Sequence, residues 1–204
     1  MKQTNKLFWD KVAGVYGIFT NLVNRKVHAK LKPLVASLIE KEDNVLECAC
    51  GNGLLTKEIA KKCKNIVATD ISEKMLSVVA KKLRKYPNVK LEQGDIMKIN
   101  YADEEFNKVV VGNVIHLLDN PSGALKELAR VCAIGGTIII PTYMNKKKKQ
   151  GSFIKNIDKA GADFKQQFSV DTYKEFFISE GYPDVKIEFI EGKIPCAVAV
   201  IKKK

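Results

Sequence analysis

Residues 45–60, VLECACGNGLLTKEIA, decide the fold of this 204-residue chain. An apolar run that contains the acidic residue Glu47 leads into a turn with Gly51 and Gly53, and a helix-forming segment begins at Thr56. Glycine tolerates positive φ and has no Cβ, so a turn of this kind bends sharply and comes close to a ligand. The stretch predicts a buried strand, a ligand-binding turn and the start of a helix, whose free N–H groups attract a phosphate or a carboxylate.

The next apolar run, residues 67–70, places an acid where a nucleoside would meet it. Asp70 ends this run, and an acid at the end of the second strand of a doubly wound sheet accepts hydrogen bonds from the ribose hydroxyls. A dinucleotide fingerprint needs a third glycine, but Thr56 or Leu54 occupies that position in the two registers that the glycines allow. The pattern therefore predicts a nucleoside cofactor and disfavours a nicotinamide-dependent oxidoreductase.

Two further predicted strands also end in polar residues. Residues 88–96 contain a short strand that ends near Asp95, and residues 106–118 contain a buried strand that ends near Asn113. If the strands are parallel, their polar ends gather at one edge of the sheet, where ligands bind in folds of this kind. The four strand-end residues are Glu47, Asp70, Asp95 and Asn113.

The segments between and after these strands carry boundary signals. A crossover helix is predicted between the N-cap Ser72 and Pro87. Closer to the carboxyl end, a helix is predicted to stop at Gly181, and two strands around Glu191 and Gly192 indicate an antiparallel hairpin at the sheet edge. The sheet is therefore expected to be mixed.

In order and combination, these motifs resemble those of class I S-adenosylmethionine-dependent methyltransferases of the small-molecule, ubiquinone-biosynthesis-like branch. The resemblance spans most of the chain and rests on VLECACGNG, VATDISEKML, QGDI, FNKVVVGNVIHLL and ELARVCAIGGTIIIPTY. It implies an α/β fold with a Rossmann-like, doubly wound, seven-stranded mixed sheet, a C-terminal antiparallel hairpin and an N-terminal helical lid. One methyltransferase domain would span residues 1–204, with the lid at 1–40, a cofactor-binding core at 41–142, a variable substrate-side insertion at 143–168, and a helix and the terminal β-hairpin at 169–204.

The resemblance implies a site for S-adenosylmethionine, which leaves S-adenosylhomocysteine as the product. The turn from Ala49 to Gly53, with Gly51 and Asn52 inside it, would hold the methionine end, and Glu47 would act through this turn or a water. Alanine replaces the first glycine of the motif. Because alanine is the mildest replacement, we expect cofactor binding to survive it.

Further residues are implied to hold the nucleoside and the ammonium group. Asp70 would bind the ribose diol, with Ile71 and Met75 beside the adenine. The remaining implied contacts are Asp95 and Ile96 at the adenine edge, and the Asn113 backbone with the neighbouring Val114 at the methionine ammonium.

Tyr16 and His116 are the candidate catalytic residues. An aromatic ring near the sulfonium stabilises its charge by about 0.5 to 2 kcal/mol. Tyr16 is the first candidate in the lid, which also contains Trp9 and Phe19; packing against the sheet is the alternative role of these aromatics. His116, at the expected mouth of the site, is the candidate general base, and a packed or surface position is its alternative. His28 lies among basic residues of the lid and is expected to be solvated.

The five cysteines do not indicate a metal site. Cys48 and Cys50 lack the spacing of a zinc pair, and the other three are scattered. An arsenite methyltransferase is a remote alternative, since no cysteine trio falls at the positions that such enzymes use. The odd cysteine number, with no signal peptide and no long apolar span, predicts a cytoplasmic protein without membrane insertion.

The net charge of +12 keeps RNA as the main alternative acceptor. Most of the excess is lysine, including residues 146–149, whereas the chain has only three arginines. Nucleic-acid recognition commonly uses the arginine fork. The composition therefore favours a small-molecule methyl acceptor, with an RNA methyltransferase and a catalytically silent cofactor-binding partner protein as alternatives.

Overall fold

The structure, a computed structural model, describes residues 3–144 and 165–204, apart from the side chains of residues 3–6, 8 and 14–23. Its helices are α1 (Gln3–Ser37), α2 (Thr56–Ala60), α3 (Glu73–Leu83), the short 3-10 helix η1 (Ile115–Leu117), α4 (Pro121–Val131) and α6 (Val170–Ser179). Its strands are β1 (Asn44–Cys48), β2 (Asn65–Asp70), β3 (Val89–Gln93), β4 (Phe106–Val111), β5 (Cys132–Tyr143), β6 (Lys186–Ile190) and β7 (Cys196–Lys202). Within the described ranges, no helix has the length and apolar character needed to cross a membrane.

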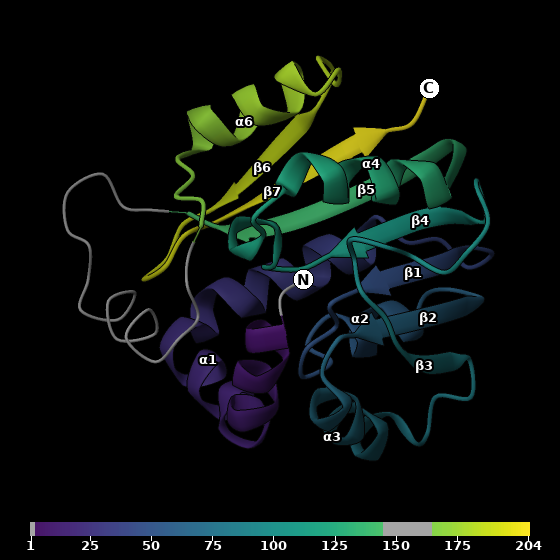
Figure 1. Ribbon diagram of the computed structural model, residues 1–204, viewed down its shortest axis with the longest axis vertical. Helices are drawn as coiled ribbons and strands as arrows, with labels where there is room; N and C mark the ends of the chain where they lie inside the picture. The colour runs from purple at the N-terminus through teal and green to yellow at the C-terminus, as the bar shows by residue number, and fades with distance from the viewer. Residues whose placement is uncertain (1–2, 145–164) are drawn as a thin grey trace.

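A seven-stranded sheet runs through the centre of the molecule in the order β3-β2-β1-β4-β5-β7-β6 (Figure 1). The first five strands in this order are parallel, whereas β7 pairs antiparallel with both β5 and β6. The predicted mixed sheet and its antiparallel hairpin at the edge are confirmed. The parallel strands share one direction, so their carboxyl ends lie along one edge of the sheet.

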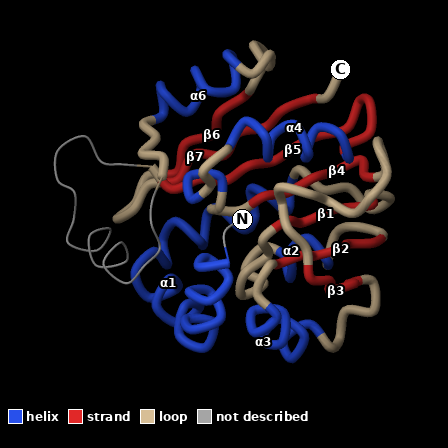
Figure 2. The backbone as a smooth tube through the Cα atoms, viewed as in Figure 1, coloured by secondary structure: helices blue, strands red, loops and turns tan. Residues whose placement is uncertain are grey.

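Helices cover both faces of the sheet (Figure 2). Leu46 and Val109 belong to the core beneath α4 and α6, and the adjacent residues Val45 and Val110 belong to the core beneath α1, α2 and α3. Successive strand residues point to opposite faces, so each buried strand contributes to both cores. This arrangement confirms the doubly wound fold.

The local boundary signals are confirmed as well. The Ser72 side chain accepts a hydrogen bond from the Met75 N–H at 3.1 Å and caps α3. Apolar residues then recur every four positions, at Met75, Val79 and Leu83, and are buried against the sheet. Gly181 follows α6 with a φ of 92°, a conformation that glycine adopts without strain.

Helix α1 bends at Asn24, whose backbone angles are not helical (φ −121°, ψ 27°). The buried Asn24 side chain binds the turn before β7 twice: it donates to the Ile194 carbonyl at 2.9 Å and accepts from the Ile194 N–H at 3.3 Å. Residues after the bend, including Val27 and Leu31, enter the core, while Figure 1 shows the earlier part of α1 beyond the ends of the parallel strands. The bend therefore directs the start of α1 towards the carboxyl edge of the sheet.

We expect Asn24→Ala to lower the free energy of unfolding by about 2 kcal/mol, because it leaves two backbone groups of Ile194 without their partner. Urea denaturation measures the change. Asn100→Ala, at an exposed position, is the matched control and should change stability by less than about 0.5 kcal/mol. Equal losses in the two variants would contradict the role of this contact.

Candidate cofactor-binding site

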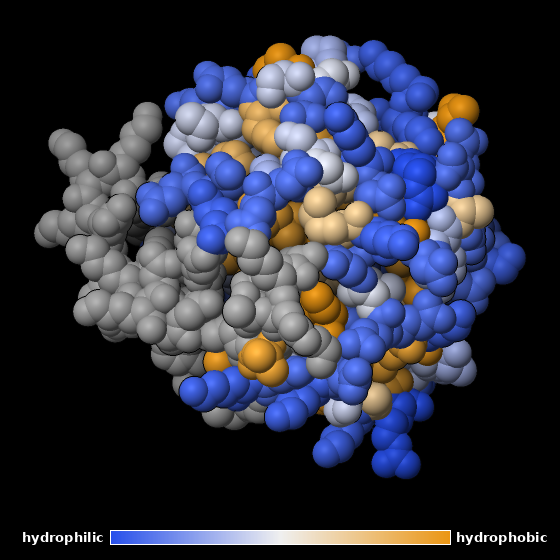
Figure 3. Space-filling model, in the orientation of Figure 1, coloured by the Kyte–Doolittle hydropathy of each residue, from blue (hydrophilic) through white to orange (hydrophobic). Residues whose placement is uncertain are grey.

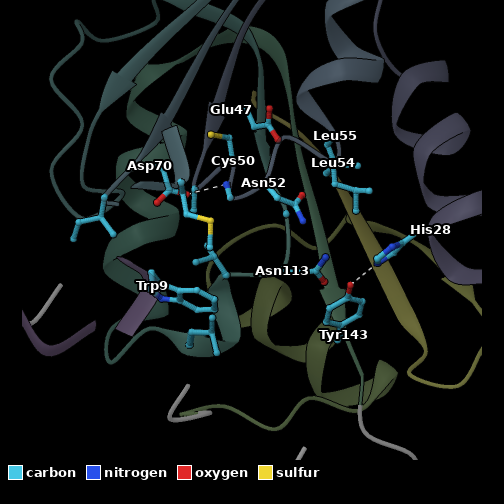
Figure 4. A pocket seen from close by; sticks show the side chains of 17 residues that line it. Trp9, His28, Glu47, Cys50, Asn52, Leu54, Leu55, Asp70, Asn113 and Tyr143 are labelled. Atoms are coloured by element: carbon cyan, nitrogen blue, oxygen red, sulfur yellow. Dashed lines mark hydrogen bonds between the residues drawn. The ribbon is translucent and has the colours of Figure 1, made fainter. Parts of the chain in front are cut away.

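A pocket lies at the carboxyl edge of the sheet, bounded by the loops after β1, β2 and β4, by the end of β5 and by α1 (Figure 4). Its lining residues are Trp9, His28, Glu47, Ala49, Cys50, Gly51, Asn52, Leu54, Leu55, Asp70, Ile71, Met75, Gly112, Asn113, Val114, Leu117 and Tyr143. In Figure 4, Asp70 and Trp9 lie on one side of the pocket and the pair His28 and Tyr143 on the other, with Asn113 between them. The pocket is therefore elongated along the strand ends.

The turn after β1 is fixed by hydrogen bonds to the end of β2. The Cys50 N–H donates to the Thr69 carbonyl at 2.9 Å, and the Gly51 N–H donates to Asp70 Oδ2 at 2.8 Å. Gly51 and Gly53 have φ values of 54° and 75°, in the region that favours glycine. The two glycines therefore supply the positive φ values that the turn requires, as the sequence predicts.

Ala49 also adopts a positive φ, 55°, at the position where the related motif has glycine. A non-glycine residue in this conformation costs roughly 1 kcal/mol or more. We expect Ala49→Gly to raise the free energy of unfolding by about 1 kcal/mol, measured by urea denaturation. The control is Ala124→Gly, in the interior of α4, which should lower the free energy of unfolding by a similar amount. A lower free energy of unfolding in Ala49→Gly would contradict the strain at this position.

Asp70 joins the turn to the start of α3. Besides accepting from Gly51, its carboxylate accepts from the Ser72 N–H through Oδ1 at 2.9 Å, and the residue is only 6% exposed. Burial raises its pKa, the bonds from Ser72 and Gly51 lower it, and the nearby Asp10 of α1 raises it. Each carboxylate oxygen accepts more than one hydrogen bond, so Asp70 retains capacity for ligand hydroxyls while its orientation is fixed.

Two buried oxygen atoms of the pocket have no hydrogen-bond partner among the described residues: Glu47 Oε2 and Asn113 Oδ1. Glu47 is 2% exposed, and burial raises the pKa of its carboxyl to about 8; Thr56 lowers this pKa and Asp70 raises it. Leaving buried polar atoms without partners is costly. Two such acceptors in one pocket suit a ligand group that carries several hydrogen-bond donors.

His28 lines the pocket and forms a hydrogen bond with Tyr143, with 2.7 Å between His28 Nε2 and the Tyr143 hydroxyl oxygen. The expectation that His28 is solvated is therefore wrong: the residue is 3% exposed. Burial, and secondarily the charge of Lys32, lower the pKa of the imidazole to about 4. Sequence reasoning missed Tyr143, although it is the last residue of β5 and so lies at the same edge as the other strand ends.

Most of the predicted cofactor residues come together in this pocket. Those that line it are Glu47, Ala49, Gly51, Asn52, Asp70, Ile71, Met75, Asn113 and Val114. Gly53, Asp95 and Ile96 are not among the lining residues, and Asp95 accepts a hydrogen bond from the Met97 N–H at 2.9 Å. The side chain of Tyr16 and most of the predicted insertion at 143–168 lie outside the described residues. The assigned roles of all these residues stay predictions.

His116 differs from the expected position at the mouth of the site. It lies in η1, is 3% exposed and is not one of the pocket-lining residues. The difference arises because the 3-10 helix turns the chain inward, where burial lowers the pKa of the imidazole to about 4. A general base works best with a pKa near the working pH. This position therefore does not favour the catalytic role of His116, which stays a prediction.

Comparisons with known proteins agree with this geometry. Residues 46–140 match a family model described as a methyltransferase domain. The chain is 30% identical over 151 residues to a demethylmenaquinone methyltransferase of Lactobacillus johnsonii, covering 67% of this chain and 59% of that protein. It is 37% identical over 90 residues to a probable ribosomal RNA small subunit methyltransferase A of Methanococcus aeolicus, covering 44% of this chain and 33% of that protein. The chain thus spans between a third and three fifths of the length of these curated relatives.

Solved structures share the fold over nearly the whole chain. The N-methyltransferase NodS of Bradyrhizobium japonicum, in complex with S-adenosyl-L-homocysteine, superposes with a TM-score of 0.76 at 17% identity, covering 98% of this chain and 99% of that one. A possible histamine N-methyltransferase of Thermotoga maritima gives a TM-score of 0.75 at 19% identity, covering 98% and 100% of the two chains. At these identities the likeness shows a common fold.

Proposed function

We propose that this chain, whose residues 46–140 match the methyltransferase domain family, transfers a methyl group from S-adenosylmethionine to a small-molecule acceptor. The observation that carries the proposal is the hydrogen bond between the Gly51 N–H and Asp70, which joins the glycine turn to the end of β2 at one side of the pocket. A turn and an acid held together in this way suit a cofactor with a ribose.

Residues that line the pocket suit the ribose, one face of the base and the ammonium group of such a cofactor. Asp70 would accept from the ribose hydroxyls, and Ile71 and Met75 supply an apolar wall for the base. Glu47 Oε2 and Asn113 Oδ1, which have no hydrogen-bond partner among the described residues, would accept hydrogen bonds from the methionine ammonium. When bound, the sulfonium supplies an electrophilic methyl group.

The protein's own contribution is to bind, orient and exclude water. Transfer of a methyl group needs the acceptor held in line with the carbon–sulfur bond, so positioning accounts for much of the rate. The acceptor would lie at the side of the pocket formed by His28 and Tyr143, away from Asp70 (Figure 4). Because burial keeps His28 uncharged, this pair would orient an acceptor by hydrogen bonding.

A small-molecule acceptor is favoured over RNA by two observations. The relative named as a demethylmenaquinone methyltransferase matches 151 residues of this chain, whereas the relative named for ribosomal RNA matches 90. The surface face in Figure 3 is largely hydrophilic. Several lysines among the described residues have acidic partners, such as Lys61 with Glu58 and Lys90 with Glu92. Lysines that are paired with acids in this way are a weaker electrostatic footprint for nucleic acid than a cluster of unpaired basic residues.

Titration calorimetry with S-adenosylhomocysteine, NAD and a short RNA, in separate experiments on the purified protein, tests the proposal. We expect micromolar binding of S-adenosylhomocysteine and no saturable binding of the other two. Methylation of small acceptors with a radiolabelled methyl donor then follows. No binding of S-adenosylhomocysteine, or tighter binding of NAD, would overturn the cofactor assignment, and saturable RNA binding would favour the RNA methyltransferase.

The placement of the acceptor makes a separate prediction about His28 and Tyr143. We expect Tyr143→Phe to change the dissociation constant for S-adenosylhomocysteine by less than about threefold, because the hydroxyl contacts His28 on the side of the pocket away from Asp70. Calorimetry measures this constant. A loss of tenfold or more would place the pair in the cofactor subsite instead. Tyr101→Phe, which removes a hydroxyl that bonds to Glu92 outside the pocket, is the matched control.

A further inference from the structure

Glu47 combines three features that bear on its protonation state before a cofactor binds. It is 2% exposed, it lines the pocket, and one of its carboxyl oxygens has no hydrogen-bond partner among the described residues. An ionised carboxylate in such a position is strongly disfavoured unless a cation or several donors compensate it. In the protein alone, the group is therefore best accommodated as the neutral acid.

The groups around Glu47 offer it no positive charge in the described residues that line the pocket. From β2, Asp70 contributes negative charge, and from α2 Thr56 contributes hydrogen bonds but no charge. The thiols of Cys48 and Cys50 come from β1 and from the turn after it. His28, on α1, is itself kept neutral by burial. Burial raises the pKa of Glu47 to about 8, with Asp70 acting in the same direction and Thr56 in the opposite one.

Resting on the function proposed above, we infer that Glu47 is protonated in the free protein and loses its proton when the ammonium group of the cofactor binds, so that cofactor binding releases one proton to solvent. Before binding, the carboxyl is neutral and the cofactor carries its ammonium charge. After binding, the carboxylate and the ammonium form a buried ion pair, and the proton has passed to the buffer. Charge and protons balance without any other reactant.

The position of Asn113 supports this pairing. Its side-chain oxygen is the second unpartnered acceptor of the pocket, and the backbone of Asn113 adopts a φ of 57°. An ammonium group has three donors, and two of them would satisfy Glu47 and Asn113 together. A buried ion pair of this kind is stable only when its remaining hydrogen bonds are made.

Calorimetric titration with S-adenosylhomocysteine in phosphate and in Tris at pH 7.0 measures the proton count, because the two buffers differ in their heat of ionisation. We expect close to one proton released per molecule bound by the wild-type protein, and close to none by Glu47→Gln. The matched control is Glu58→Gln, a surface acid that pairs with Lys61, which should release the same number as the wild type. Linkage also predicts an affinity that rises about tenfold between pH 6 and pH 7 in the wild type and is flat in Glu47→Gln.

A second probe distinguishes Glu47 from Asp70. 5′-Methylthioadenosine keeps the ribose and the base but has no ammonium group, so its binding should release no proton. Binding of S-adenosylhomocysteine without proton release, or equal release with methylthioadenosine, would overturn the inference and leave the proposed function intact. Failure of the wild-type protein to bind S-adenosylhomocysteine would instead overturn the proposed function. If Glu47→Gln does not fold, the comparison of the two probes with the wild-type protein decides the question.

Discussion

Asp70→Ala is expected to weaken the binding of S-adenosylhomocysteine by about a hundredfold or more. The substitution removes the acceptor for the ribose hydroxyls, and each hydrogen bond to a charged group contributes roughly 1.5 to 3 kcal/mol. It also removes the acceptor of the Gly51 and Ser72 N–H groups, so the glycine turn and the start of α3 lose their connection. Both effects reduce affinity, and calorimetry measures their sum.

Two comparisons make the Asp70 result specific. Asp103→Ala removes an exposed acid that pairs with Arg130, and it should bind S-adenosylhomocysteine like the wild type. Asp70→Asn keeps the shape of the side chain but replaces one acceptor by a donor, so we expect an affinity between those of the wild type and Asp70→Ala. An affinity of Asp70→Ala within threefold of the wild type would contradict the ribose assignment.

Acidification is expected to destabilise the protein through His116. Its pKa is lowered from 6.5 to about 4 in the folded state, so between these values the unfolded chain binds a proton that the folded chain does not. The stabilising contribution is thus present above pH 6.5 and is lost as pH falls towards 4. A shift of this size corresponds to about 3 kcal/mol.

Urea denaturation at pH 7 and pH 4 in the wild type and in His116→Gln measures this contribution. The loss of unfolding free energy on acidification should be about 3 kcal/mol smaller in the variant, whatever its stability at pH 7. The chain has only two histidines, so NMR titration with His28→Gln and His116→Gln assigns each imidazole. An imidazole of His116 that titrates near pH 6.5 would contradict the prediction.

Glu47 should make the folded protein less stable as the pH rises, which is the opposite of the effect of His116. Its folded-state pKa is raised to about 8, so its contribution to stability is complete below about pH 4.5 and is lost as pH rises towards 8. Glu47→Gln should therefore retain more stability at pH 8, relative to pH 5, than the wild type does. Urea denaturation of both proteins at pH 5 and pH 8 measures this difference and needs no ligand.

The strand ends were readable from the sequence because they depend on local patterns. Glu47, Asp70 and Asn113 follow apolar runs, and parallel strands bring their carboxyl ends to one edge whatever else the fold does. Ser72 was readable for a similar reason, since a helix cap is decided within a few residues. The same rule, applied to the fifth strand, would have selected Tyr143.

The burial of the two histidines could not be predicted from local sequence patterns. His28 lies in a segment with many lysines, and its burial depends on the bend at Asn24 and on the contact with Ile194, which is 170 residues away. His116 is buried in the short helix η1, which no periodic pattern in the sequence predicts. In both cases distant packing decides the position of the side chain.

The contact between Asn24 and Ile194 also has a consequence for the order of assembly. The first helix is attached to the turn that precedes the last strand, and His28 meets Tyr143 across 115 residues. Contacts between such distant segments form late, because the loop that they close must first lose its entropy. On the ribosome, the glycine turn and Asp70 emerge early, but the contact that fixes the bend at Asn24 requires Ile194, so a nascent chain that ends before residue 190 would not yet hold His28 in its place beside Tyr143.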